Sequence, residues 1–143
     1  MIANFGVAVS APPTSLFENG IHPPMKIVHI ITRLIVGRAQ QNTLLSCRGQ
    51  VTLGHDVTLI TGPSTGPEGS LHERAREWGI RVVVLDQMRR SILPIKDISS
   101  YFHLVKTLRS LQPDIVHTHS SKAGIIGRLA ARHAEAPVII HTI

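Results

Sequence analysis

The sequence predicts an open α/β fold, in which a parallel sheet of about five strands carries helices on both faces. Short aliphatic runs alternate along the chain with longer segments of helical period. The short runs, such as KIVHIIT, are nearly continuous in Val, Ile and Leu, which is typical of parallel strands buried on both faces. Such a series winds with right-handed crossovers, and the usual order of five strands is 3-2-1-4-5, as in a Rossmann-like half.

The elements follow from these runs in chain order. Residues 1–24 contain four prolines, two glycines and no sustained period, so we expect an irregular arm before one domain at 25–143. Gly54 and Gly79 follow the first two predicted helices, where a left-handed cap is favoured. We expect strands at 26–32, 56–61, 81–86, 114–119 and 137–142, and helices at 39–54, 69–79, 97–112 and 121–135.

The composition indicates one soluble domain with an aliphatic core, since 43% of the 143 residues are hydrophobic and only 3% are aromatic. Lys and Arg exceed Asp and Glu by 15 to 9, and this net charge of +6 favours anionic partners. The charges are scattered, however, which solvated helix faces would also give. Nucleic acid is not expected as a partner, because helix-turn-helix, zinc-finger and RNP motifs are missing and few aromatic residues are present to stack on bases.

Cysteine usage and hydropathy favour a cytoplasmic location. Cys47 is the single cysteine, which excludes an intrachain disulfide and a CxxC site. No apolar run approaches the roughly 18 to 20 residues that span a bilayer. No Lys or Arg precedes the apolar part of the first residues, so a secretory signal is a poor match.

Ligands of an open α/β sheet bind beyond the carboxyl ends of the strands, where the winding reverses between the first and fourth strands. This rule singles out 32–38, 117–122 and 141–143. In HTHSSKAG, His117 and His119 share one strand face, and Ser120 then begins a helix whose free backbone N–H groups attract anions.

Lys122 adds positive charge to this helix start, and we expect His141, on the next strand, to bring a third imidazole to the same crevice. The pattern indicates an anion or sugar-phosphate pocket with histidine hydrogen-bonders. The alternative is that the serines only cap a helix and that one histidine is a satisfied buried side chain. No metal is expected, because the His-x-His pair lacks a third ligand and Asp114 lies at the far end of its strand.

Several enzyme classes have no support in the sequence. Gly37 stands alone after the first strand, so there is no GxGxxG motif. The stretch GPSTGPEGS (62–70) lacks the Gly-Lys-Ser/Thr of a phosphate loop and is expected to form a flexible loop. No GxSxG elbow and no locally paired acids indicate a hydrolase.

Four stretches together resemble the amino-terminal domain of family 4, group 1 glycosyltransferases: MKIVHIITRLIVGRAQQNTLL, LGHDVTLITGP, PDIVHTHSSKAGIIGRLAA and PVIIHTI. The similarity covers Met25–Ile143. It implies one half of a GT-B enzyme, which retains anomeric configuration and has its active site between two Rossmann-like domains. In that family the amino-terminal domain mainly holds the acceptor, and the carboxy-terminal domain binds most of the nucleotide-sugar donor. No cofactor besides this co-substrate is expected.

The resemblance also assigns residues. Gly37 belongs to the glycine loop that approaches the donor diphosphate and the acceptor, while His117, His119, Ser120 and Lys122 lie on the cleft side. The family usually has a second glycine where this chain has Arg38, followed by Ala or Val and then Gln or Glu, which Ala39 and Gln40 match. The Arg38 side chain would either obstruct a ligand or pair with phosphate oxygens.

The sequence is compatible with three functions. The first is the acceptor-binding domain of a glycosyltransferase for a glycan or lipid-linked acceptor, inactive without a carboxy-terminal domain and with possible contact to an anionic membrane. The second is the amino-terminal half of a GT-B nucleotide-sugar epimerase, which downstream paired catalytic acids would distinguish from the two-glutamate motif of a transferase. The third is a non-catalytic α/β binding module, against which the apolar stretch PVIIHTI at a sheet edge argues.

Overall fold

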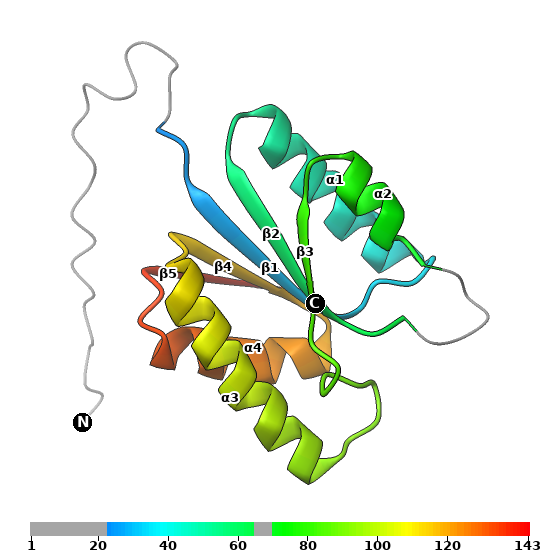
Figure 1. The fold of residues 1–143 in the computed structure, drawn as a ribbon, viewed down its shortest axis with the longest axis vertical. Helices are drawn as coiled ribbons and strands as arrows, with labels where there is room; N and C mark the ends of the chain where they lie inside the picture. Colours follow the sequence, from blue (N-terminus) through cyan, green and yellow to red (C-terminus); the bar gives the residue numbers. More distant parts are fainter. Residues whose placement is uncertain (1–22, 65–69) are drawn as a thin grey trace.

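The computed structural model describes residues 23–64 and 70–143 as one sheet with helices on both faces (Figure 1). In chain order the elements are β1 (Lys26–Arg33), α1 (Arg38–Thr52), β2 (Asp56–Gly62), α2 (His72–Glu77), β3 (Arg81–Val84), α3 (Pro94–Leu111), β4 (Ile115–His119), α4 (Ser121–His133) and β5 (Val138–Thr142). The strands are parallel and lie in the order β3-β2-β1-β4-β5, which confirms the predicted fold class and strand order.

The sheet separates two apolar cores. Helices α1 and α2 cover one face, and α3 and α4 cover the other (Figure 1). On β1, Ile30 packs into the α3 and α4 core, whereas Ile31 packs into the α1 and α2 core, because successive strand residues point to opposite faces. Both side chains are at most 1% exposed. The central strand is therefore buried on both sides, as its continuous aliphatic run indicates.

Most element boundaries match the sequence pattern, and the largest differences are at α2, which is shorter than predicted (His72–Glu77 rather than 69–79), and at the start of α3. This helix begins at Pro94 rather than at residue 97. Pro94 is well placed in a first turn, where its missing N–H loses no helical bond, and Asp97 Oδ2 accepts a hydrogen bond from the Leu93 N–H at 3.2 Å. The apolar period that predicts the helix becomes visible only after this turn.

The predicted left-handed helix caps are confirmed, with φ of +89° at Gly54 and +75° at Gly79. The predicted arm at 1–24 lies outside the described residues apart from its last two positions, and so does most of the predicted loop at 62–70. Within the described ranges, no helix combines the length and the apolar character that crossing a membrane requires. The edge strand β5 leaves Val138, Ile139 and Ile140 between 37% and 44% exposed.

Candidate functional site

Two adjoining cavities lie at the carboxyl ends of β1 and β4, where the winding of the sheet reverses. We call the first, of about 430 Å³, the basic cavity; its walls are Ile31, Thr32, Arg33, Gln40, Arg90, Ser120, Ser121 and Lys122. We call the second, of about 280 Å³, the histidine cavity; its walls include His117, His119, Ser120, Gln40 and Thr142. Five of the predicted site residues, Gln40, His117, His119, Ser120 and Lys122, thus border these cavities.

Ser120, which directly follows β4, contacts the end of β1. Its hydroxyl lies 3.1 Å from Thr32 Oγ1, and within the described residues its side chain makes no capping hydrogen bond to α4. The sequence left open the alternative that Ser120 simply caps the helix, and the structure contradicts this alternative. Its φ of +67° is unusual for a residue with a Cβ and costs about 1 to 3 kcal/mol, and such strain often accompanies functional sites.

The start of α4 gives the basic cavity its capacity for anions. The first backbone hydrogen bond of this helix runs from the Gly124 N–H to the Ser120 carbonyl. The N–H groups earlier in the helix therefore have no carbonyl partner within it. Together with the helix dipole they attract negative charge. Arg33 and Arg90 add two basic residues to the same walls. Sequence reasoning missed both arginines as site residues, although Arg33 stands within the predicted loop at 32–38.

Lys122 has a structural partner that the sequence did not reveal. Its Nζ lies 2.5 Å from Asp97 Oδ1 and donates a hydrogen bond to the Ser91 carbonyl, and both charged side chains are less than 20% exposed. This ion pair ties the first turn of α4 to the first turn of α3. Lys122 therefore shapes the wall of the basic cavity, and its charge is largely matched by that of Asp97.

We expect Lys122→Met to lower the free energy of unfolding by about 2 kcal/mol, because it leaves the Asp97 carboxylate partly buried without its cation. Urea denaturation followed by circular dichroism measures the change. Lys106→Met, on an exposed position of the same helix pair, is the matched control and should change stability by less than about 0.5 kcal/mol. Equal stabilities of the two variants would contradict this role for the ion pair.

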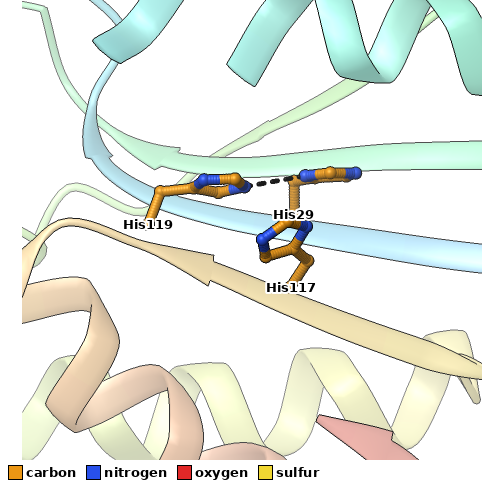
Figure 2. A group of neighbouring side chains, drawn as sticks. All are labelled: His29, His117 and His119. Carbon is orange, nitrogen blue, oxygen red and sulfur yellow. Dashed lines mark hydrogen bonds between the residues drawn. The ribbon is translucent and has the colours of Figure 1, made fainter. Parts of the chain in front are cut away.

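Three histidines gather on the α1 side of the sheet. His29 lies on β1 directly opposite His117 on β4, and His119 follows two residues later on the same face (Figure 2). The ring centroids are 4.1 to 5.2 Å apart, and His29 Nδ1 lies 2.9 Å from His119 Nε2. The predicted shared face of His117 and His119 is confirmed.

Side chains on α1 and β5 fix two of these rings from outside. His29 Nε2 donates to Gln50 Oε1 at 2.7 Å, and His117 Nε2 lies 2.7 Å from Thr142 Oγ1. Burial lowers the pKa of His29 to about 4 and, with the neighbouring His117, that of His119 to about 3. The pKa of His117 is lowered as well, mainly by burial. At neutral pH the cluster is a group of uncharged imidazoles.

His141 does not join this cluster, so the expected grouping with His117 and His119 is wrong. It pairs with Thr118 across the β4 and β5 ladder, and its Nδ1 lies 3.0 Å from Thr118 Oγ1. Thr118 points away from its two histidine neighbours because side chains alternate along a strand. His141 consequently packs against Gly124 of α4, on the opposite face of the sheet.

The third imidazole comes instead from His29, which sequence reasoning missed. The available signal was a single polar residue within the aliphatic run KIVHIIT, on the strand expected beside the fourth strand. Gly37 immediately precedes α1, and Arg38 is its exposed first residue. Among the described residues, neither contributes to the walls of the two cavities. Their role near a ligand stays a prediction.

In sequence, the chain is similar to known glycosyltransferases. The sequence profile of the glycosyl transferase 4-like domain matches residues 37–143. The chain is 34% identical over 122 residues to the UDP-Gal:alpha-D-GlcNAc-diphosphoundecaprenol alpha-1,3-galactosyltransferase of Escherichia coli, covering 85% of this chain and 30% of that protein. It is 30% identical over 71 residues to the N,N'-diacetylbacillosaminyl-diphospho-undecaprenol alpha-1,3-N-acetylgalactosaminyltransferase of Campylobacter jejuni, covering 50% of this chain and 19% of that protein.

Solved structures give the same fold. A glycosyltransferase from Rickettsia africae superposes with a TM-score of 0.66 at 18% identity, over 85% of this chain and 30% of that one. A putative UDP-N-acetylglucosamine 2-epimerase from Listeria monocytogenes superposes with a TM-score of 0.58 at 15% identity, over 84% and 30%. At these identities the superpositions establish the fold alone.

The profile match covers most of the chain, and this protein therefore belongs to the glycosyl transferase 4-like domain family. It spans less than a third of the length of either curated relative.

Proposed function

We propose that this domain is the acceptor-binding half of a retaining glycosyltransferase, which transfers a sugar from a nucleotide-sugar to a lipid-linked diphosphate acceptor. The observation that carries the proposal is the basic cavity, where Arg33, Arg90 and the first turn of α4 surround space at the carboxyl edge of the sheet. Two relatives support it, because both of their names specify a diphospho-undecaprenol acceptor. Such an enzyme would serve cell-envelope polysaccharide synthesis.

The two cavities suit different parts of such an acceptor. The α4 N-terminus and the guanidinium groups match the charge of a diphosphate. Gln40, Asn42 and Ser46 line the adjoining histidine cavity, and their amide and hydroxyl groups can exchange hydrogen bonds with the hydroxyl groups of the acceptor sugar. Transfer also needs a donor held in line with the acceptor, and in this family that task falls to a second domain. We expect this domain alone to bind acceptor without transferring sugar.

Calorimetric titration with N-acetylglucosamine joined through a diphosphate to a short alkyl chain tests the cavity assignment. We expect Arg90→Ser to weaken binding about 5- to 10-fold, as a lost charge-assisted contact of 1 to 1.4 kcal/mol would. Arg132→Ser, which makes the same charge change at the far end of α4, should bind like the wild type. Equal weakening by both variants would mean that net charge, not the cavity, attracts the ligand.

The face formed by α3 and α4 supports peripheral contact with the cytoplasmic face of an anionic membrane. Ile95 is 85% exposed, Phe102 63% and Ile125 58%, and basic residues such as Lys96 and Arg128 stand on the same two helices. The Lys122 to Asp97 ion pair places the first turn of α3 next to the basic cavity. An acceptor diphosphate could thus enter the cavity while its lipid stays in the bilayer.

Vesicle sedimentation tests this arrangement. The chain should bind vesicles containing 30% phosphatidylglycerol more tightly than neutral ones, and the double substitution Ile95→Ser and Phe102→Ser should weaken that binding about 10-fold. Leu53→Ser is the control, since Leu53 is 75% exposed at the end of α1, on the other side of the sheet. Equal binding to neutral and anionic vesicles would contradict the membrane proposal. It would not bear on the diphosphate cavity, which the calorimetric titration tests.

A nucleotide-sugar epimerase is the weaker alternative. The fold does not separate the two, since an epimerase structure shares it, whereas the curated relatives described above are transferases. A free-standing binding module is disfavoured by the exposed apolar side chains of β5, which indicate that this edge packs against something further.

A further inference from the structure

The cluster of His29, His117 and His119 has the composition and spacing of a metal site. One ring nitrogen from each histidine lies within 4.8 Å of the other two (Figure 2). Zn²⁺ with three histidine ligands is a common arrangement, with each nitrogen about 2.0 to 2.1 Å from the ion, so the nitrogens of such a site lie roughly 3.3 Å apart. His29 Nδ1 and His119 Nε2 lie 2.9 Å apart in a hydrogen bond, about 0.4 Å closer than in such a site, and a bound ion would take the place of the shared proton.

The outward-facing ring atoms are held as they are in metal sites. Gln50 Oε1 can only accept, so it fixes the proton of His29 on Nε2 and leaves the Nδ1 lone pair facing His119. Thr142 Oγ1 lies 2.7 Å from His117 Nε2 and orients that ring, so Nδ1 can serve as its ligand atom when Nε2 carries the proton. Ligating histidines usually make such outer hydrogen bonds, which set the tautomer and orient the ring.

The site has an open side. His117 and His119 both line the histidine cavity of about 280 Å³, whereas His29 is fully buried behind them. An ion held by three imidazoles would therefore have its fourth position directed to this cavity, where a water or an anionic oxygen can bind.

We propose that His29, His117 and His119 form a divalent transition-metal site, best matched to Zn²⁺, with one coordination position open to the histidine cavity. Within its own strand the His-x-His pair of β4 lacks a third ligand, and the neighbouring β1 supplies it as His29. The site goes beyond the proposed transferase function and does not depend on it. Imidazole donors also suit Cu²⁺, Ni²⁺ and Co²⁺, and Co²⁺ provides a spectroscopic probe.

The test is a titration of the tag-free chain, first stripped of metal with EDTA, with Co²⁺ and then with Zn²⁺ in competition. We expect one equivalent of Co²⁺ to give the visible absorption bands of a four-coordinate ion and Zn²⁺ to abolish them. His117→Gln, at the open side of the cluster, should weaken binding at least 100-fold while circular dichroism shows an unchanged fold. Gln50→Leu removes only the outer hydrogen bond and should weaken it about 10- to 100-fold.

His103→Gln is the matched control, because His103 lies exposed on α3 and contacts Ser99. This variant should bind Co²⁺ like the wild type. Absence of the bands in the folded wild type would overturn the proposal, and so would a His117→Gln variant that keeps its affinity. Loss of acceptor binding in the earlier titration would leave the metal site unaffected, so the two proposals fail separately.

Discussion

Gly62→Ala should destabilise the domain by about 3 to 5 kcal/mol, which is a large share of the net stability of a small domain. Gly62 is the last residue of β2, where the chain after β3 passes close by. A Cβ at this position would collide with the backbone carbonyl oxygen of Met88 and would lie 2.6 Å from that of Thr32. Because both obstacles are backbone atoms, no change of side-chain rotamer relieves the overlap.

Urea denaturation of the purified variants checks this prediction. Gly49→Ala is the control, since Gly49 lies within α1 and a Cβ there meets nothing within 4 Å. That variant should be more stable than the wild type by about 0.5 to 1 kcal/mol, because alanine loses less conformational entropy in a helix. An unfolding midpoint for Gly62→Ala within error of the wild type would show that the carboxyl end of β2 is not packed against the backbone of Met88 and Thr32 as described.

Acidification should destabilise the metal-free chain through its histidine cluster. The folded pKa of His29 is about 4, whereas an unperturbed histidine titrates near 6.5. The unfolded state therefore takes up a proton as the pH falls below 6.5, while folded His29 stays neutral. Its contribution to stability is complete above pH 6.5 and is lost as the pH falls towards 4, by roughly 3 kcal/mol from this residue alone. His119 acts in the same direction.

Urea unfolding at pH 7.5 and pH 4.5, in the presence of EDTA, measures this loss. Carboxyl groups begin to titrate in the same range, so the informative comparison is with His29→Gln, which cannot take up the proton but can still form a hydrogen bond with Gln50. We expect His29→Gln to be less stable than the wild type at pH 7.5 and to lose markedly less stability on acidification. Equal pH dependence in both proteins would mean that the buried imidazole is not the cause.

The fold was predictable because its signal is repeated along the chain. Each aliphatic run indicates one strand, and the order 3-2-1-4-5 follows from general rules for crossovers. The ends of α3 were less accessible to sequence reasoning, because Pro94 and Asp97 define its start by local hydrogen bonds rather than by an apolar period.

The candidate site was predictable only in part, since its residues depend on contacts between distant segments. His117, His119 and Ser120 were found because one short stretch contains them beside a switch point. The positions of His29 and His141 relative to the site could not be predicted, because they depend on which face of the sheet each side chain takes. The register of the strand pairing decides that face. Likewise, the pairing of Lys122 with Asp97 joins two helices, and no local pattern in the sequence predicts it.

We propose that the start of α4 and the end of β1 hold the diphosphate of an acceptor. The most direct measurement is the change in backbone amide NMR shifts when the ¹⁵N-labelled chain is titrated with N-acetylglucosamine diphosphate carrying a short alkyl chain. We predict that the largest changes fall on Ser121, Lys122 and the neighbouring residues Thr32 and Arg33. Shifts confined to the opposite edge of the sheet, around Lys26, Asp56 and Arg81, would contradict the account.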